Sequence, residues 1–289
     1  MKITIGSVQF GLPYGISNLT GQVSLGEIEK ILTLARSRSV DVIDTAIAYG
    51  ESEAALGMVG VSDFNIITKL PTIPSSLIDY TGWVEKHVEG SLSRLKKNSI
   101  HGLLVHDPEF LKSTCGEKLG LALDKMKSSG MVQKIGVSIY QPSVLEDIMK
   151  KVPIDIVQAP LNVVDTCIVS SKWLDKLYRA DIKVHARSIF MQGLLLMDRK
   201  SIPKKFNRWA FLWDHWHQKL KTHDLDALTQ CVSFVNSISK IDRVIVGIES
   251  SLQFKQILNV IDLGCSPIDW SEMSSDDQML INPSNWGDL

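Results

Sequence analysis

The sequence lacks the features of several protein classes. Its only cysteines are Cys115, Cys167, Cys231 and Cys265, which are widely spaced and form no Cys-x-x-Cys pair. Such spacing argues against a disulfide framework and favours a reducing compartment. No apolar run approaches the roughly 18 residues that a membrane helix needs, and no small-residue cleavage site follows the first residues. We therefore expect a cytoplasmic protein without a membrane partner.

An excess of charge is also missing. The 289 residues carry 31 Lys and Arg against 32 Asp and Glu, a formal net charge of -1. Nucleic-acid surfaces and polybasic membrane surfaces need clustered positive charge, so neither is expected. His215-x-His217 has no cysteine or carboxylate cluster to complete a metal site, and no metal is predicted. The hydrophobic share of 44% is ordinary for a globular enzyme.

What is present is a regular alternation of short β-rich runs with amphipathic helical segments. The eight runs predicted as strands are Ile3–Val8, Val40–Asp44, Phe64–Thr68, His101–Val105, Lys134–Ser138, Asp155–Gln158, Ile182–Arg187 and Arg243–Gly247. The helical patterns include residues 25–39, 78–97, 116–129, 144–151, 170–180, 223–239 and 252–263. This order predicts a single (β/α)₈ barrel domain over residues 1–289, with a long 188–221 connection and a 266–289 tail.

The rival fold is a doubly wound sheet that binds a dinucleotide. That fold wants a Gly-x-Gly-x-x-Gly turn that opens a helix after an early strand. The glycine-rich stretch from Gly6 to Gly15 lacks this spacing and holds Pro13 where the helix would begin. The barrel is therefore the favoured fold.

Four polar residues stand at or just beyond the ends of short apolar runs. They are Asp44, Tyr49, Lys69 and His106. Parallel barrel strands bring their carboxyl ends to one mouth, where such enzymes keep their chemistry. A phenol donates a proton well only where a neighbouring cation stabilises its phenolate. Together the four groups suit proton transfer to a carbonyl oxygen, although each taken singly is as easily explained by packing or a salt bridge.

These residues carry a family resemblance. The segment Asp44-Thr45-Ala46-x-x-Tyr49-Gly50-x-Ser52-Glu53-x-x-Leu56-Gly57, followed by Thr68-Lys69 and Val105-His106, resembles the aldo-keto reductases. Weaker similarities continue in the family's order along nearly the whole chain. The resemblance implies a (β/α)₈ barrel, an NADPH coenzyme, Tyr49 as the general acid of carbonyl reduction, and Asp44, Lys69 and His106 as its supporting residues.

The resemblance also implies coenzyme contacts. Ser138 and Gln158 correspond to positions that hold the nicotinamide carboxamide, and residues 187–194 to the loop over the nicotinamide and pyrophosphate. Residues 247–253 correspond to the loop and helix start at the adenosine phosphate, where helix N–H groups suit an anion. The expected coenzyme-binding residues are Ser7, Ser138, Gln158, Arg187, Ser188, Gly193, Gly247, Glu249, Ser251 and Gln253.

Three positions depart from the family pattern. Ile139 replaces an asparagine, and Arg187 replaces an aromatic ring that stacks on the nicotinamide. Arg187 can itself stack on a ring or reach toward an anionic substrate. Glu249 follows the last strand where an arginine often binds the 2′-phosphate, so NADH becomes a possible coenzyme beside NADPH. The alternative is that Glu249 faces solvent and Ser250, Ser251 or Lys255 binds the phosphate.

Two further segments are candidates for the substrate side. Gln9, Phe10 and Tyr14 follow the first strand and are expected to line the mouth, although Phe10 is as easily a packing residue. Trp209, Trp213 and Trp216 recur at helical spacing, which predicts the buried face of a helix. A lid over the coenzyme or a wall against a sugar is the alternative for this tryptophan-rich segment.

The sequence thus predicts an oxidoreductase that passes hydride between a nicotinamide coenzyme and a small carbonyl or alcohol. Two other functions stay open: a coenzyme-binding regulatory subunit with little turnover, and a barrel lyase or isomerase that uses no nicotinamide. Arg187 favours an anionic or polar substrate, and the tryptophans favour a sugar. Nothing in the sequence indicates an oligomeric state.

Overall fold

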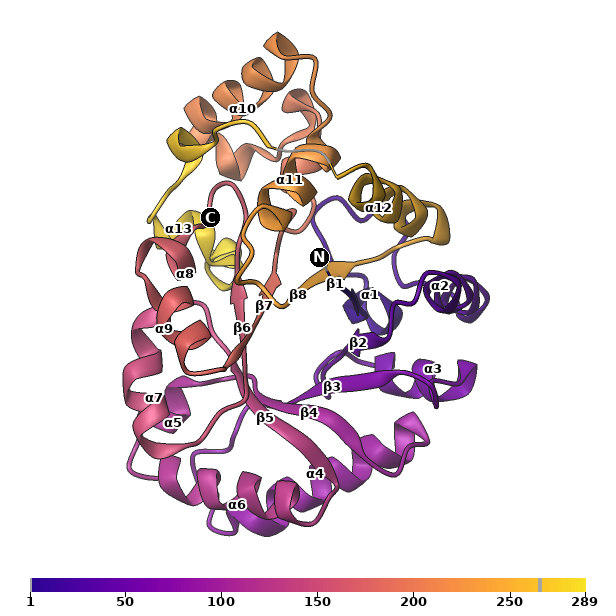
Figure 1. Ribbon diagram of the computed structural model, residues 1–289, viewed down its shortest axis with the longest axis vertical. Coiled ribbons are helices and arrows are strands. Elements are labelled where there is room, and N and C mark those ends of the chain that lie inside the picture. The colour runs from indigo at the N-terminus through magenta and orange to yellow at the C-terminus, as the bar shows by residue number, and fades with distance from the viewer. Residues whose placement is uncertain (1, 265–266) are drawn as a thin grey trace.

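The computed structural model describes residues 2–264 and 267–289. Eight parallel strands follow one another in chain order around a closed barrel (Figure 1). They are β1 (Lys2–Gly6), β2 (Val42–Asp44), β3 (Asn65–Leu70), β4 (Ile100–Val105), β5 (Val132–Ser138), β6 (Ile156–Pro160), β7 (Lys183–Arg187) and β8 (Arg243–Gly247). The predicted (β/α)₈ fold is confirmed, and all eight predicted strands overlap the observed ones.

The first predicted strand was too long. β1 ends at Gly6, and Val8 instead begins the short helix α1 (Val8–Gly11). The chain turns there because Ser7 is bonded to the end of β2: its N–H and its hydroxyl both donate to the Asp44 carbonyl, each at 3.0 Å. Val8 is therefore at the barrel mouth rather than inside the sheet.

Helices cover the outside of the barrel, as Figure 1 shows. Besides α1 they are α2 (Leu25–Ser37), α3 (Ser52–Val59), α4 (Tyr80–Leu95), α5 (Glu109–Lys112), α6 (Gly116–Ser128), α7 (Leu145–Lys151), α8 (Cys167–Ser170), α9 (Trp173–Arg179), α10 (Ala210–Thr222), α11 (Ala227–Asn236), α12 (Ser251–Leu263) and α13 (Gln278–Ile281). Short 3₁₀ helices lie at Pro142–Val144, Leu194–Leu196, Arg199–Ser201, Lys204–Trp209, Ser271–Met273 and Pro283–Asp288.

Two predicted helices differ in their bounds from the observed ones. The 170–180 pattern is interrupted at Lys172, whose φ of 63° separates α8 from α9. The 223–239 pattern begins only at Ala227, because the Asp226 carboxylate accepts from the Thr229 N–H and caps the helix there. The predicted start of the 25–39 helix matches α2, which Ser24 caps because its hydroxyl accepts from the Glu27 N–H.

The strand register gathers the candidate residues at one rim. Gly6 pairs with both Asp44 and Gly247, and Ser138 pairs with Gln158. These positions are the last or nearly the last of their strands, so their side chains share the carboxyl end of the barrel. The barrel interior is packed by Val42, Ile67, Leu104 and Ile156.

A second hydrophobic core forms beside the barrel. The 188–221 connection and the described part of the 266–289 tail fold together there, around the buried rings of Trp209, Trp213, Trp216, Trp270 and Trp286. Figure 1 shows α10 of this core beyond the ends of the strands. The prediction that the tryptophan spacing marks a buried helix face is confirmed. Ser266, the first residue of the predicted tail, lies outside the described residues, as does Cys265.

Among the helices of the described residues, none is long and apolar enough to cross a membrane.

Candidate active site at the barrel mouth

A buried ion pair forms the base of the site. The Lys69 ammonium lies 2.6 Å from a carboxylate oxygen of Asp44, and the two side chains are 2% and 5% exposed. Lys69 also donates to the Thr45 carbonyl at 2.9 Å. Burial alone would lower the pKa of Lys69, but Asp44 and Tyr49 outweigh it and the pKa is raised. Lys69 is therefore a charged ammonium at neutral pH.

Tyr49 lies directly above this pair. Its ring centroid is 5.1 Å from the Lys69 Nζ, and its ring also lines the cavity. Two glycines set its position, since a Cβ on Gly11 would stand 1.9 Å from the Tyr49 carbonyl oxygen. Gly50 has a φ of 53°, and a Cβ there would stand 2.5 Å from the Gly11 carbonyl oxygen. Only glycine fits at these two positions without moving the phenol.

Ser52 and Glu53, from the same Asp44-to-Gly57 segment, anchor the loop that carries Tyr49. The Ser52 hydroxyl contacts the hydroxyls of Ser7 and Thr45 at 2.8 and 3.1 Å. Glu53 is only 2% exposed, and its carboxylate meets the Arg94 guanidinium at 2.7 Å and the Thr68 hydroxyl at 2.6 Å. These buried bonds join α3, α4 and β3, so Ser52 and Glu53 position the loop that carries Tyr49.

His106 faces Tyr49 from the end of β4. The two ring centroids lie 6.0 Å apart with an interplanar angle of 79°. Burial, together with the charges of Lys69 and Arg187, lowers the pKa of His106 to about 4. The imidazole is therefore neutral near pH 7 and can donate or accept a hydrogen bond without carrying charge.

A cavity of about 350 Å³ opens above these groups. This volume is in the range of small-molecule sites. Asp44, Tyr49 and His106 line it, as do the predicted residues Ser7, Gln9, Tyr14, Ser138, Arg187, Ser188, Gly193, Gly247, Glu249 and Gln253. Lys69 lies beneath the floor and reaches the cavity only through Asp44 and Tyr49.

Besides Lys69, three predicted residues do not line the cavity. Phe10 is fully buried in the main core, so its expected place on the substrate side was wrong. Gln158 is fully buried below the floor and donates from its side-chain amide to the Asp44 carboxylate. Ser251 faces α2 instead, as described below. The tryptophans 209, 213 and 216 are likewise absent from the lining, which contradicts the lid and sugar-wall alternatives.

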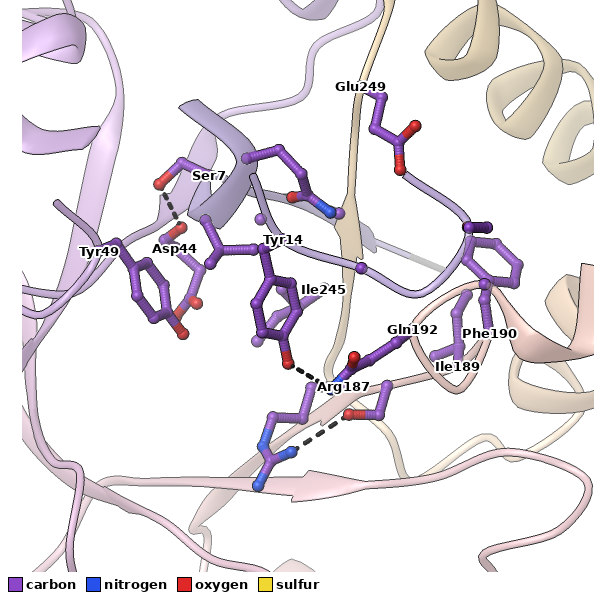
Figure 2. Close-up of a pocket in the computed structure, with 18 of the residues that line it drawn as sticks. Ser7, Tyr14, Asp44, Tyr49, Arg187, Ile189, Phe190, Gln192, Ile245 and Glu249 are labelled. Carbon is purple, nitrogen blue, oxygen red and sulfur yellow. Dashed lines mark hydrogen bonds between the residues drawn. The ribbon is translucent and has the colours of Figure 1, made fainter. Parts of the chain in front are cut away.

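Two loops meet across the cavity. The loop after β7 has left-handed backbone at Ser188, Met191, Gln192 and Gly193, of which only the last is glycine. The Ile16 N–H donates to the Gln192 carbonyl at 3.1 Å, and the Gln192 amide donates to the Tyr14 hydroxyl at 2.8 Å (Figure 2). A Cβ on Gly193 would stand 1.8 Å from the Ser17 hydroxyl. The loops after β1 and β7 therefore form one connected wall.

The outer rim is formed by the start of α12. Ser250 caps this helix by accepting from the Gln253 N–H. The N–H and the hydroxyl of Ser251 both donate to one carboxylate oxygen of Glu27, each at 2.7 Å. These bonds, chiefly that of the Ser251 hydroxyl, lower the pKa of Glu27 to about 2. A carboxylate of the chain thus occupies the helix end that was expected to bind a phosphate.

Glu249 stands next to that helix end and lines the cavity (Figure 2). Its N–H donates to the Gln253 side chain at 2.9 Å, and burial raises the pKa of its carboxyl group. The sequence interpretation did not expect Glu27 to contact the start of α12. No local signal marks this contact, because 224 residues separate Glu27 from Ser251. Tyr140, two residues beyond Ser138, also lines the cavity and was missed.

Comparison with known proteins decides the family. The sequence profile of the Aldo/keto reductase family matches residues 2–277. The chain belongs to the aldo/keto reductase family. The resemblance inferred from the Asp44-to-Gly57 segment is thereby confirmed, and aldo/keto reductases are oxidoreductases that use nicotinamide coenzymes.

A curated relative is the aldo-keto reductase of Mycolicibacterium vanbaalenii, 32% identical over 137 residues. The match covers 45% of this chain and spans 46% of that relative, less than half its length. Solved structures of similar fold include an aldo-keto reductase from Bacillus halodurans, with a TM-score of 0.71 at 17% identity over 94% of this chain and 89% of that one. A glycerol dehydrogenase from Gluconobacter oxydans has a TM-score of 0.66 at 19% identity, over 92% and 93%. At sequence identities this low, the similarity to these two structures supports the fold alone.

Proposed function

We propose that this aldo/keto reductase reduces a small carbonyl compound, or oxidises the matching alcohol, with a nicotinamide coenzyme. The observation that carries the proposal is the phenol of Tyr49 above the buried Asp44–Lys69 pair, in a cavity of substrate size. A phenol next to a fixed ammonium is suited to proton donation, because the ammonium stabilises the phenolate left behind.

The site suits the amide end of such a coenzyme. The side-chain oxygen of Gln158 is buried without a hydrogen-bond partner among the described residues, beneath the floor formed by Asp44. An unpartnered buried acceptor is costly and is satisfied by an N–H donor. Ser138 lines the cavity and would hold the carboxamide, with Ser188 and Gly193 beside the phosphates, and Gln158 would support the carboxamide from below the floor. When bound, the coenzyme supplies or accepts the hydride.

The chain's own residues then handle the proton. In the reducing direction Tyr49 donates its hydroxyl proton to the carbonyl oxygen, and Lys69 stabilises the resulting phenolate. Asp44 keeps Lys69 charged and in place, since it accepts from Lys69 at 2.6 Å. The neutral imidazole of His106 donates a hydrogen bond to the same carbonyl oxygen and orients it. A proton acid positioned in this way contributes about 10²–10⁴-fold in rate.

The coenzyme preference is a further part of the proposal. We propose weak selectivity for NADPH and real use of NADH. Glu249 lines the outer end of the cavity, and Glu27 takes both donors of Ser251. A carboxylate repels the 2′-phosphate of NADPH but can accept a hydrogen bond from the free ribose hydroxyl of NADH. We also propose a cytoplasmic location, which cell fractionation would test.

The experiment that tests the function combines binding with turnover. Tryptophan fluorescence is followed while the purified protein is titrated with NADPH and, separately, with NADH. Steady-state rates are then measured on a panel of aldehydes, ketones and alcohols. Saturable binding together with turnover supports the reductase. Binding without turnover on the panel favours a regulatory subunit, and no binding of either coenzyme favours a lyase or isomerase.

A further inference from the structure

The cavity has an uneven distribution of charge. Arg187 is the only lysine or arginine among the described residues that line it. The negative charge of Asp44 at the floor is paired with Lys69, and Glu249 stands at the far side from Arg187 (Figure 2). The catalytic end of the cavity therefore carries one positive charge that no lining carboxylate pairs with.

Arg187 is held by several contacts, although none of the described acids forms an ion pair with it. Its guanidinium donates to the Ile139 carbonyl at 3.0 Å and to the Ser188 hydroxyl at 3.2 Å. It also lies over the Tyr140 ring, 4.4 Å from the centroid. Its Nε is buried without a hydrogen-bond partner among the residues described. These contacts fix the position of the Arg187 guanidinium and leave some of its N–H groups without an acceptor.

Neighbouring acids do not neutralise Arg187 directly. Within the described residues no carboxylate oxygen lies within 4.0 Å of its nitrogens, since Arg187 belongs to none of the ion pairs found there. Asp165 is the buried acid behind it, and burial raises the pKa of that carboxyl to about 6. The Arg187 charge does reach the reacting end, because it contributes after burial and Lys69 to the low pKa of His106.

We propose that the substrate carries an anionic group, a carboxylate or a phosphate, which pairs with Arg187 while its carbonyl meets Tyr49. A guanidinium presents its N–H groups in a plane that matches either anion bidentately. The proposal rests on the proposed carbonyl chemistry and adds the substrate class. It assigns Arg187 to substrate recognition rather than to stacking on the coenzyme.

Matched substrates test this class. Succinic semialdehyde is compared with butanal, and glyceraldehyde 3-phosphate with glyceraldehyde, so that each pair differs by the anionic group. In at least one pair we expect kcat/KM to be roughly 10- to 100-fold higher for the anion, as hydrogen bonds to charged groups allow. The pair that shows the preference identifies carboxylate or phosphate. Raising the salt concentration should raise the KM of the anionic member alone.

Substitution at Arg187 locates the preference. Arg187→Met is expected to bring the anion-to-neutral ratio of kcat/KM close to one, and Arg187→Lys to restore part of it. Arg179→Met is the matched control, because it removes the same charge from the exposed end of α9. Benzoate binding by isothermal titration, with benzamide as the neutral match, gives a readout that does not depend on turnover.

The outcomes separate the two proposals. Equal turnover of anionic and neutral partners in both pairs overturns the anionic class and leaves the reductase intact. If Arg187→Met keeps the anion-to-neutral ratio of kcat/KM but binds the coenzyme more weakly, Arg187 contacts the coenzyme and the anionic class is overturned. If the protein reduces no carbonyl compound, the proposed reductase function fails, and the anionic substrate class fails with it. If Arg187→Met does not fold, the salt dependence of the unmodified protein decides.

Discussion

The two ends of the cavity are built in opposite ways. The inner end comes from strands: Asp44 ends β2, Lys69 stands in β3, and their charges meet at 2.6 Å with both side chains almost fully buried. The outer end comes from loops and a helix start, where Glu249 and Glu27 crowd the first turn of α12. Paired charges in a dry site are expensive to break, whereas charges at an open rim can change with little effect on the fold.

The largest expected effect is at the inner end. Lys69→Met leaves the Asp44 carboxylate buried without its cation, so we expect the free energy of unfolding to fall by about 3–5 kcal/mol and turnover to be lost. Urea unfolding followed by circular dichroism measures the first quantity. The double variant Asp44→Leu/Lys69→Met removes both charges and should recover much of the stability but none of the turnover. Unchanged stability of the single variant would show that the pair is not buried.

Tyr49→Phe separates chemistry from stability within the same end. It removes the proposed proton donor and keeps the ring, so we expect turnover to fall by about 10²–10⁴-fold while the coenzyme dissociation constants stay within a few-fold. The matched control is Tyr178→Phe on the exposed side of α9. Normal turnover in Tyr49→Phe would mean that another group donates the proton.

At the outer end we expect selectivity to change while stability does not. Glu27→Gln removes the carboxylate that accepts both hydrogen bonds from Ser251. We expect the ratio of the NADPH dissociation constant to the NADH dissociation constant to fall by about tenfold. This is the effect of a charge near a helix N-terminus at the upper end of its usual range. Glu29→Gln, an exposed neighbour on α2, should leave the ratio unchanged. A hundredfold preference for NADPH in the unmodified protein would refute the proposed use of NADH.

A pH dependence of stability is expected from His106. Its pKa of about 4 lies below the 6.5 of a free imidazole, so the unfolded chain binds more protons between these values. The contribution to stability is therefore present above pH 6.5 and is lost as the pH falls toward 4. His106→Gln should lose less free energy of unfolding between pH 7 and pH 4.5 than the unmodified protein. Equal losses in the two proteins would mean that the imidazole is not desolvated.

The sequence predicted the barrel and the inner end well, for a physical reason. Buried parallel strands are continuous apolar runs, and the side chain just after each run stands at the mouth. Asp44 and His106 could therefore be placed by counting. Phe10 could not, because an apolar side chain after a strand can face either the cavity or the core, and the packing of α1 put it in the core.

The sequence by itself determined the order of strands, the identity of the groups at their ends and the buried face of the tryptophan helix, since each depends on a local period. The tertiary structure alone decided which distant segments meet. It brought Glu27 to Ser251 across 224 residues and tied Gln192 to Tyr14 across 178. It also left Arg187 without a carboxylate oxygen within 4.0 Å among the described residues. These contacts depend on how helices and loops close over the barrel, and no periodicity in the chain encodes that closure.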